Sequence, residues 1–413
     1  MSDVVIAGNT SGSITLRSPA VSGSSVLTLP VATDTLVGKA TTDTLTNKTL
    51  TSPTLTTPAL GTPASGILTS CTGLNYNGFK SRIINGNMAI SQRGTGVFTQ
   101  DTTGTQYSLD RWNIYGSVAS KFTAQQTPSA TETGFATRVA AGFTDYLGIT
   151  SSSTYAVTAG EVFQLQQLIE GFNTADLAWG TAAAKTVTLS FWVYSSLTGT
   201  FGGSFANSAA NRSYPFSYSI PAANTWTQIS ITAPGDTSGT WIGATNGIGI
   251  RVYFGIGVGT SGSGPANAWA GVLYRSVTGA VSVVGTNGAT FYITGVQLET
   301  GSTATSFDYR PYSTELSLCQ RYYVGANGVY SFTAGYDASY TTINTGGLAW
   351  SYQMRTTPTI VIVSGGMDGH HAVAPTVRTG PTYYGVGLQF SGSGLRTNSN
   401  CSAYVSFSLS AEI

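Results

Sequence analysis

Leucines recur at a strict period of five in residues 43–67, and this spacing restricts what the segment can fold into. They are Leu45, Leu50, Leu55 and Leu60. An odd period cannot keep one face of a flat strand apolar, because strand side chains alternate between faces at every residue. It fits neither the helical period of about 3.6 residues nor the collagen triplet. Each unit must therefore bend or wind about an axis, with one leucine directed inward.

A segment of this kind has no second layer against which to bury its leucines. Pieces of about 40 residues or fewer usually need a disulfide, a metal or oligomerisation to be stable. Cys71, Cys319 and Cys401 are too few and too scattered for a disulfide framework or a tetrahedral zinc site. We therefore predict an intertwined shaft of parallel chains with the four leucines as its core. A flexible Thr/Pro linker is the alternative.

The low charge of the chain excludes several functional classes. Only 8% of the 413 residues are charged, the net charge is +1, and no cluster of Lys and Arg is present to neutralise nucleic-acid phosphates. No apolar run approaches the roughly 20 residues that span a membrane. The first residues lack the basic and apolar regions of a secretory signal. We expect a protein made in a reducing cytosol and destined for an assembly.

Alternating residues and abundant turn formers predict an all-β protein. The chain has 51 glycines, and serine and threonine occur throughout, which favours turns and strands over helices. Strands are predicted in the central part at 186–196, 226–234, 247–259 and 290–299, and in the last part at 340–354, 357–366, 383–392 and 401–413. Many short strands without intervening helices indicate a sandwich or jelly roll.

Two segments of the central part give more specific predictions, one for a strand and one for a helix. Phe191 and Trp192 are adjacent in an alternating strand, so at least one of them must lie in the core. Val162, Leu165, Ile169 and Phe172 recur at helical spacing, and this period predicts a helix over 161–172.

Several segments resemble the tail-fibre family of tailed bacteriophages. The pentads at 43–67 resemble the Thr/Leu/Pro repeats near the N-termini of such fibres. Residues 81–94 and 107–112 ("SRIINGNMAISQRG", "YSLDRW") resemble the opening of their β-sandwich, and 169–201 and 291–323 continue the match through its end. The closing "MRTTPTIVI" and "SLSAEI" are similar to their C-terminal knob.

This resemblance implies an elongated homotrimeric fibre within the virion tail, assembled in the host cytoplasm. Its expected regions are an N-terminal tail-attachment segment (1–40), a pentad-repeat shaft or linker (41–78), a central jelly-roll-like β-sandwich (79–310) and a C-terminal receptor-binding β-knob (311–413). The N-terminus would dock on a tail, baseplate or adaptor protein. The distal end would bind a host surface polysaccharide or outer-membrane protein, without nucleic-acid binding or membrane insertion. The resemblance also implies strand and loop, rather than helix, over 161–172.

Aromatic side chains in the last part of the chain are the expected sugar contacts. A flat ring packs on the C–H face of a pyranose, while Asn, Asp and Arg bind hydroxyl groups. The candidate receptor-binding residues are Tyr330, Tyr336, Tyr340, His370, His371, Arg378, Tyr383 and Tyr384. Each tyrosine alone is better explained by packing, but the cluster favours at least one receptor contact. Trp269, in "GPANAWAG", is a second glycan-binding candidate.

His370 and His371 are the two histidines of the chain. In a trimer, one histidine per chain facing the axis would supply three nitrogen ligands. Fibre tips that resemble this architecture hold axial metals through a His-x-His pattern, but here the histidines are adjacent and would point to opposite faces of a strand. We therefore expect a solvated loop or receptor contact and no cofactor or metal, with His371 as the one candidate ligand.

The predicted function is attachment of a virion to its host by multivalent glycan recognition, without catalysis. Glycoside hydrolysis requires two carboxylates about 5–10 Å apart, and the acids are sparse. Glu299 and Asp308 are expected to form structural ion pairs beside Arg310; Asp337/Asp368 is the other close pair. No nucleophile elbow or phosphate-binding loop is present. The alternatives are a depolymerase or deacetylase acting on surface polysaccharide, and a purely structural tail component.

Overall fold

The computed structural model separates the chain into two units, residues 1–69 and 70–413. It describes residues 4–7, 10–16, 80–128, 132–325, 330–334, 342–344, 348–349, 353–367, 376–379, 385–391 and 401–413. In the first unit, β1 (Val4–Ala7) and β2 (Ser13–Leu16) form an antiparallel hairpin. The runs "SITLRSP" (13–19) and "SVLTLPVATDTLVG" (25–38) predict short N-terminal strands; β2 lies in the first run, β1 lies in neither, and the second run is outside the described residues. The leucines of the predicted shaft (Leu45, Leu50, Leu55 and Leu60) lie outside the described residues.

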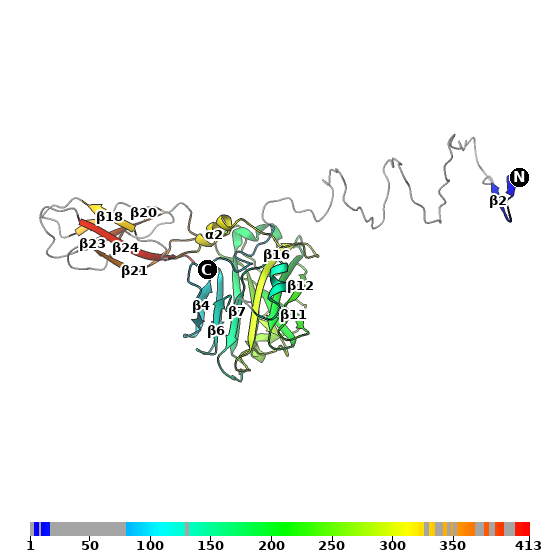
Figure 1. Cartoon of the computed structure of the whole chain (residues 1–413), viewed down its shortest axis with the longest axis horizontal. Helices are drawn as coiled ribbons and strands as arrows, with labels where there is room; N and C mark the ends of the chain where they lie inside the picture. Colours follow the sequence, from blue (N-terminus) through cyan, green and yellow to red (C-terminus); the bar gives the residue numbers. More distant parts are fainter. Residues whose placement is uncertain are drawn as a thin grey trace. The chain divides into compact units, whose positions relative to one another are not determined.

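The second unit contains two six-stranded antiparallel sheets packed face to face (Figure 1). In spatial order, the first sheet consists of β11 (Ser213–Ile220), β10 (Gly199–Ala206), β13 (Ile248–Val258), β8 (Val162–Glu170), β5 (Trp112–Gly116) and β4 (Gly104–Leu109). The second consists of β12 (Thr227–Ala233), β9 (Val187–Ser195), β16 (Thr290–Thr300), β7 (Leu147–Ser151), β6 (Phe122–Gln126) and β3 (Phe98–Thr99). The predicted β-sandwich is confirmed, and all four central strands lie where the alternation placed them.

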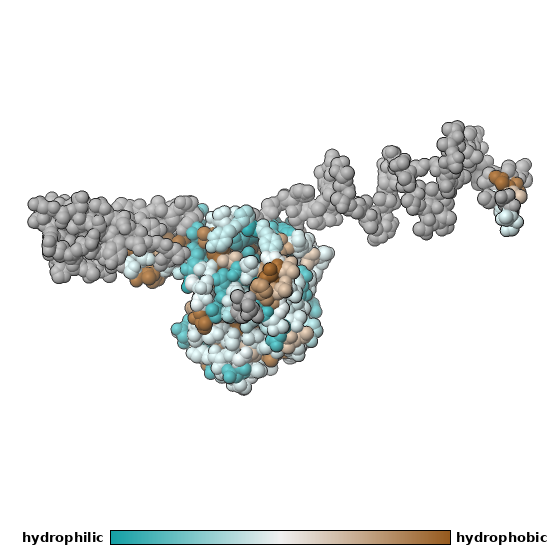
Figure 2. Space-filling view, viewed as in Figure 1, coloured by the Kyte–Doolittle hydropathy of each residue, from teal (hydrophilic) through white to brown (hydrophobic). Residues whose placement is uncertain are grey.

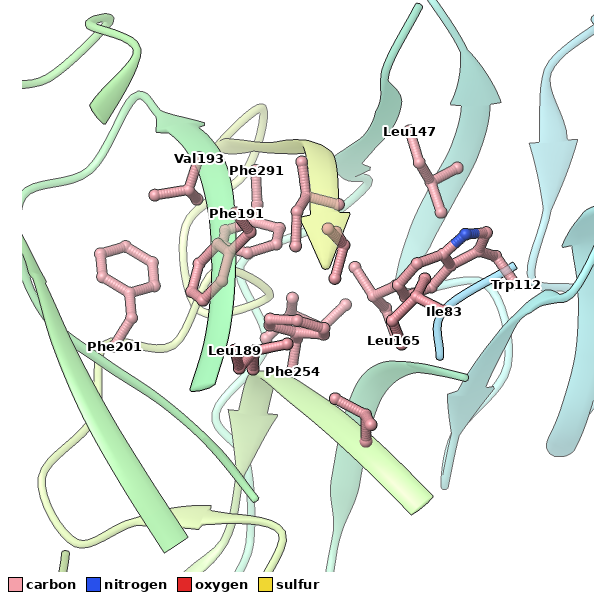
Figure 3. Close-up of a cluster of buried hydrophobic side chains, with 14 of the residues drawn as sticks. Ile83, Trp112, Leu147, Leu165, Leu189, Phe191, Val193, Phe201, Phe254 and Phe291 are labelled. Atoms are coloured by element: carbon pink, nitrogen blue, oxygen red, sulfur yellow. The ribbon is translucent and has the colours of Figure 1, made fainter. Parts of the chain in front are cut away.

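The core lies between the sheets and is rich in aromatic rings. Phe191 of β9 packs edge-to-face on Phe254 of β13, with ring centroids 5.1 Å apart (Figure 3). Trp112 of β5 contributes the largest fully buried side chain. Trp192 points to the other face of β9 and is half-buried, so the prediction that at least one of this adjacent pair is core is confirmed.

The helix predicted from periodicity over 161–172 is wrong, and the strand implied by the resemblance is confirmed; residues 171 and 172 belong to a 3-10 helix instead of the implied loop. Residues 162–170 form β8, which lies between β13 and β5 with every residue buried. A strand buried on both faces carries apolar residues without strict alternation, and some then fall at helical spacing by coincidence. The chain continues as two short 3-10 helices, η1 (Gly171–Asn173) and η2 (Ala175–Leu177).

Within the described residues, short helices lie at three other places, and the sequence predicted none of them. These are α1 (Phe135–Ala140), α2 (Tyr312–Gln320) and η3 (Thr260–Gly262). Two two-residue strands, β14 (Ser263–Gly264) and β15 (Ser276–Val277), follow η3 and pair in parallel. The loop between them is closed by this pair, and β15 packs on strands of the first sheet. No helix in the described part of the chain is long and apolar enough to cross a membrane.

The C-terminal region is also built from strands. One sheet contains β17 (Tyr323–Val324), β24 (Cys401–Ser410), β18 (Tyr330–Ala334) and β21 (Thr359–Met367); the other contains β19 (Thr342–Asn344), β23 (Gly385–Ser391), β20 (Leu348–Ala349) and β22 (Thr376–Thr379). Each stretch predicted as strand beyond residue 340 contains at least one of them. Side chains beyond residue 330 are described for 353–364 and 405–413.

The last residues return to the sandwich, and Figure 1 shows the C-terminus beside β4. Glu412 forms ion pairs with Arg93 and Arg111, and the Tyr107 hydroxyl of β4 donates to the Ile413 carbonyl. The Arg355 side chain also donates to the carbonyl groups of residues 411 and 412. The base of the C-terminal region is therefore held on the sandwich by buried polar contacts.

Candidate functional site

Trp269 belongs to a cluster of three indole rings at one end of the sandwich, called the tryptophan cluster below. Trp179 follows η2, Trp241 lies between β12 and β13, and Trp269 lies in the loop between β14 and β15. Ring centroids are 4.7 Å apart for Trp179 and Trp241, 5.3 Å for Trp179 and Trp269, and 5.5 Å for Trp241 and Trp269. All three pairs meet edge to face, which is a favoured arrangement of aromatic rings.

The protein itself satisfies the three indole N–H groups. Trp179 Nε1 donates to the Lys185 carbonyl at 2.8 Å, and Trp269 Nε1 donates to the Pro234 carbonyl at 2.9 Å. Trp241 Nε1 donates to the Asp236 carboxylate at 3.2 Å. These bonds fix the orientation of each ring. What the cluster offers to a ligand is therefore aromatic ring surface.

Asp236 organises the polar side of the cluster. Its buried carboxylate accepts two hydrogen bonds from Arg212, Nε to Oδ2 at 2.8 Å and Nη2 to Oδ1 at 2.6 Å. The Arg212 guanidinium lies 6.0 Å from the centroid of the Trp269 ring, within the range of a cation–π contact. A bidentate pair of this kind fixes both partners, so the loops that carry Trp241 and Trp269 are held in one arrangement.

A pocket of about 280 Å³ opens beside the cluster. Trp179 and Trp241 form its aromatic part, and the remaining lining residues are small or aliphatic apart from two threonines: Thr174, Ala175, Ala178, Thr181, Ile242, Gly243, Ala244, Gly249 and Ile250. Its volume is near the lower end of the range of about 300–1,000 Å³ that is typical of ligand pockets. No charged side chain lines it.

The backbone around the pocket is unusual in two places. Ala178 and Ala244 both adopt left-handed conformations, with φ of 52° and 53°, which residues with a Cβ rarely adopt. Gly249 is required by packing, because a Cβ there would lie 2.2 Å from Thr174 Oγ1. Strained backbone of this kind persists where the surrounding structure imposes it and is enriched at binding sites.

The other predicted receptor contacts are not brought together by the described residues. Tyr336, Tyr340, His370, His371, Tyr383 and Tyr384 lie outside them. Tyr330 belongs to β18 and Arg378 to β22, where the backbone alone is described. Their role as receptor contacts, and His371 as a metal ligand, therefore stay predictions.

The acidic residues examined as catalytic candidates have structural roles where they are described. Asp308 forms the expected ion pair with Arg310 at 3.5 Å. The expectation of an ion pair for Glu299 is corrected: its buried carboxylate accepts hydrogen bonds from neutral groups of Gln297 and Thr305. Asp337 and Asp368 lie outside the described residues. Within the described part of the chain, no group of three His, Cys, Asp or Glu side chains is placed to hold a metal ion.

Sequence reasoning found Trp269 and missed Trp179, Trp241, Asp236 and Arg212. A local signal was available for the two tryptophans. "LAWG" and "TWIG" place each of them within two residues of a glycine and outside an alternating strand, as "AWAG" does for Trp269. Tryptophan in glycine-rich loops indicates ring surface that no strand pattern buries. The pairing of Asp236 with Arg212 had no such signal, because it depends on the tertiary fold.

No protein-family model and no curated protein matches this chain. Among solved structures, it is similar to the enzymatically active domain of tailspike protein 4 from bacteriophage CBA120 (10% identity, TM-score 0.26, 54% of this chain and 21% of that one). It is also similar to TmCBM61 in complex with β-1,4-galactotriose (10%, 0.23, 46% and 88%) and to the family 11 carbohydrate-binding module of Clostridium thermocellum in complex with a β-1,3-1,4-mixed-linked tetrasaccharide (11%, 0.25, 50% and 100%). The chain thus spans about a fifth of the tailspike domain. These values are low, so the function proposed below rests on the chain's own side chains.

Proposed function

We propose that this chain is an attachment protein of the phage tail-fibre type, which binds host surface glycans through its β-sandwich and C-terminal strands. The observation that carries the proposal is the tryptophan cluster beside an uncharged pocket. A pyranose ring has an apolar C–H face and polar edges. Trp241 is half-buried and lines the pocket, so its ring can pack against that face while loop backbone groups meet the hydroxyls.

Binding of this kind is weak at a single site and gains strength from repetition. Linked identical sites raise overall attachment by roughly 10²–10⁴ when they engage together. We therefore include the homotrimer in the proposal. The edge of β21 supports self-association: Val361 and Val363 are 54% and 61% exposed, and in the described part of the chain β21 pairs with β24 alone. An exposed apolar edge strand favours association with another chain.

The N-terminal hairpin supports docking on another tail component. An isolated two-stranded hairpin is marginally stable in water. The β1–β2 hairpin exposes Val5 by 60% and Ile6 by 53%, so a partner surface that covers these side chains would stabilise it. The proposal therefore assigns virion attachment to the N-terminus and host binding to the unit formed by residues 70–413.

The proposed function does not include cleavage of the glycan. Three of the buried carboxylates are bound to arginines: Glu132 to Arg138, Asp236 to Arg212, and Glu170 to Arg321. Asp110 and Glu299 are also buried, and they accept hydrogen bonds from neutral groups. An arginine partner stabilises the ionised carboxylate, whereas the general acid of a glycosidase must hold its proton.

The proposal is tested with the purified full-length chain on a panel of lipopolysaccharide and capsular polysaccharide glycans, with reducing ends measured in the same tubes. We expect saturable binding without release of reducing ends. Release of reducing ends would make the protein an enzyme, and the absence of binding to every glycan would reject glycan recognition. A fragment of residues 70–413 is the appropriate truncation, because Glu412 and Arg355 bind the sandwich and a C-terminal fragment alone would lose those contacts.

A further inference from the structure

The pocket beside the tryptophan cluster is lined by side chains whose hydrogen-bond donors are already in use. The lining side chains that carry a donor are Thr174, Thr181, Trp179 and Trp241. Thr174 Oγ1 donates to the Gly171 carbonyl at 3.1 Å, and Thr181 Oγ1 donates to the Ala178 carbonyl at 2.7 Å. Both indole N–H groups are bound within the protein, as described above. The lining side chains in the described part of the chain therefore offer a ligand no unused donor.

The rest of the lining is apolar. It consists of two glycines together with Ala175, Ala178, Ala244, Ile242 and Ile250. Ala178 and Ala244 adopt left-handed conformations that glycine would adopt without strain. Alanine at these two positions keeps methyl groups in the lining at a cost in backbone strain. This lining favours a ligand group that is itself apolar.

The pocket is accessible from solvent. Its lining residues Ala175, Thr181 and Ala244 are exposed, and they mark its mouth. Gly249 and Ile250 are buried, and they mark its inner end. The half-buried side chains of Trp241 and Ile242 line the space between them. A group that enters past the mouth therefore meets aromatic and aliphatic surface.

This arrangement distinguishes a methyl group from a hydroxymethyl group. A hydroxyl group at the inner end would lose its hydrogen bonds to water, and no donor of a lining side chain would replace them. A methyl group in the same place gains free energy by leaving water. Hydroxyl groups at the mouth keep their contact with solvent or with loop backbone. The pocket should therefore select the substituent that the sugar places inside it.

We propose that the inner end of this pocket holds the methyl group of a neutral sugar, from either a 6-deoxyhexose or an N-acetylated hexosamine. Ile242 and Ile250 contact the methyl group, and the Trp241 ring packs against the C–H face of the same sugar. The inference rests on the proposed function and deepens it, because it names the class of glycan that the tryptophan cluster and its pocket bind.

The test compares sugars that differ only by CH₃ against CH₂OH, using the full-length chain and ligand-observed NMR titration. The deoxy pairs are L-rhamnose with L-mannose and L-fucose with L-galactose. The acyl pair is N-acetylglucosamine with N-glycolylglucosamine. We expect the methyl-bearing member to bind about ten- to a hundredfold more tightly in at least one pair. The pair that shows this difference identifies the source of the methyl group.

Variants of Ile242 test whether the pocket causes the preference. Ile242→Asn places an amide in the lining that can bind a hydroxyl group, so the preference for methyl should be lost or reversed. Ile242→Val keeps an aliphatic lining and should retain the preference. The matched control is Leu197→Asn, because Leu197 is also a half-buried loop residue but does not line the pocket. It should leave the preference unchanged.

The sugar pairs are compared first on the unaltered chain, so the inference does not depend on the folding of a variant. Equal binding within every pair, or a full preference for methyl in a folded Ile242→Asn protein, would overturn the inference. If none of these sugars binds but another glycan of the lipopolysaccharide and capsule panel does, the inference fails and the proposed function stands. If no glycan binds, the proposed function fails as well.

Discussion

Arg321 binds Glu170 through two hydrogen bonds, Nε to Oε2 at 2.9 Å and Nη2 to Oε1 at 2.6 Å. Glu170 is the last residue of β8, which is an inner strand of the first sheet. Arg321 directly follows α2, and the C-terminal strands begin after it. The Tyr322 hydroxyl donates to the same carboxylate at 2.6 Å. One buried carboxylate therefore joins the sandwich to the base of the C-terminal region.

Replacing Glu170 by Gln should destabilise the protein by about 2 kcal/mol, because an arginine fork and a tyrosine lose their charged acceptor. Removal of one partner of a buried pair costs roughly 3–5 kcal/mol, and the partial exposure of Arg321 reduces this. The measurement is chemical unfolding at pH 7. Asp176→Asn is the control, because Asp176 forms an exposed ion pair with Arg82 and should change stability by less than about 1 kcal/mol. Equal effects of the two substitutions would contradict the prediction.

The Glu170 contribution also has a pH dependence of known sign. Burial alone would raise its pKa, but hydrogen bonds from Arg321 and Tyr322 and the charges of Arg321 and Arg355 hold the pKa of Glu170 below its ordinary value. A lowered folded-state pKa stabilises the protein above the unfolded pKa, and this stabilisation is lost as the pH falls through the folded value. The stability difference between wild type and Glu170→Gln should therefore shrink below about pH 4.

The contribution of Asp110 to stability should depend on pH with the opposite sign to that of Glu170. Burial raises the pKa of Asp110 to about 6, against the hydrogen bonds that its carboxylate accepts from Gln92. The folded protein then holds a proton that the unfolded chain has released between about pH 4 and 6, so this group lowers stability as the pH rises through that window. Relative to wild type, Asp110→Asn should gain on the order of 2 kcal/mol between pH 4 and 7. Parallel pH profiles of the two proteins would exclude this.

Gly295 is required by a bulge in β16. Its φ is 61°, and a Cβ there would lie 2.5 Å from Phe143 Cζ. Gly295→Ala should therefore cost about 2–4 kcal/mol, since both backbone strain and overpacking act against it. Gly271→Ala is the control, because its Cβ would meet open space, and its effect should stay within about 0.5 kcal/mol. Thermal unfolding of both variants measures the difference.

The fold was more predictable than the site because strand signals are local. Alternation in 186–196 placed β9, since one side of that strand packs on the core and its pattern is visible without the tertiary structure. The same reasoning failed for β8, because apolar residues occur on both of its faces and four of those at 162–172 fall at helical spacing, whereas in β9 the polar Thr188 and Ser190 keep the alternation visible although that strand is buried almost as completely. At the site, Trp269 could be proposed from its glycine-rich loop. The partners of Trp269 depend on loops brought together from distant parts of the chain.

Trp241→Ala should weaken binding of neutral glycans by about tenfold or more, because it removes a ring that lines the pocket and packs on two other indoles. Loss of one aromatic contact of about 0.5–1.5 kcal/mol, together with the apolar area of the ring, accounts for this change. Trp241→Phe keeps an aromatic face but loses the Nε1 bond to Asp236, and it should retain part of the affinity. Trp192→Ala is the matched control, since that ring is also half-buried but lies on the outer face of the second sheet.

Glycan binding and thermal unfolding are measured for each variant, so that a lost glycan contact can be told apart from a loss of folding. If Trp192→Ala and Trp241→Ala weaken binding equally while both remain folded, the tryptophan cluster is not the binding site.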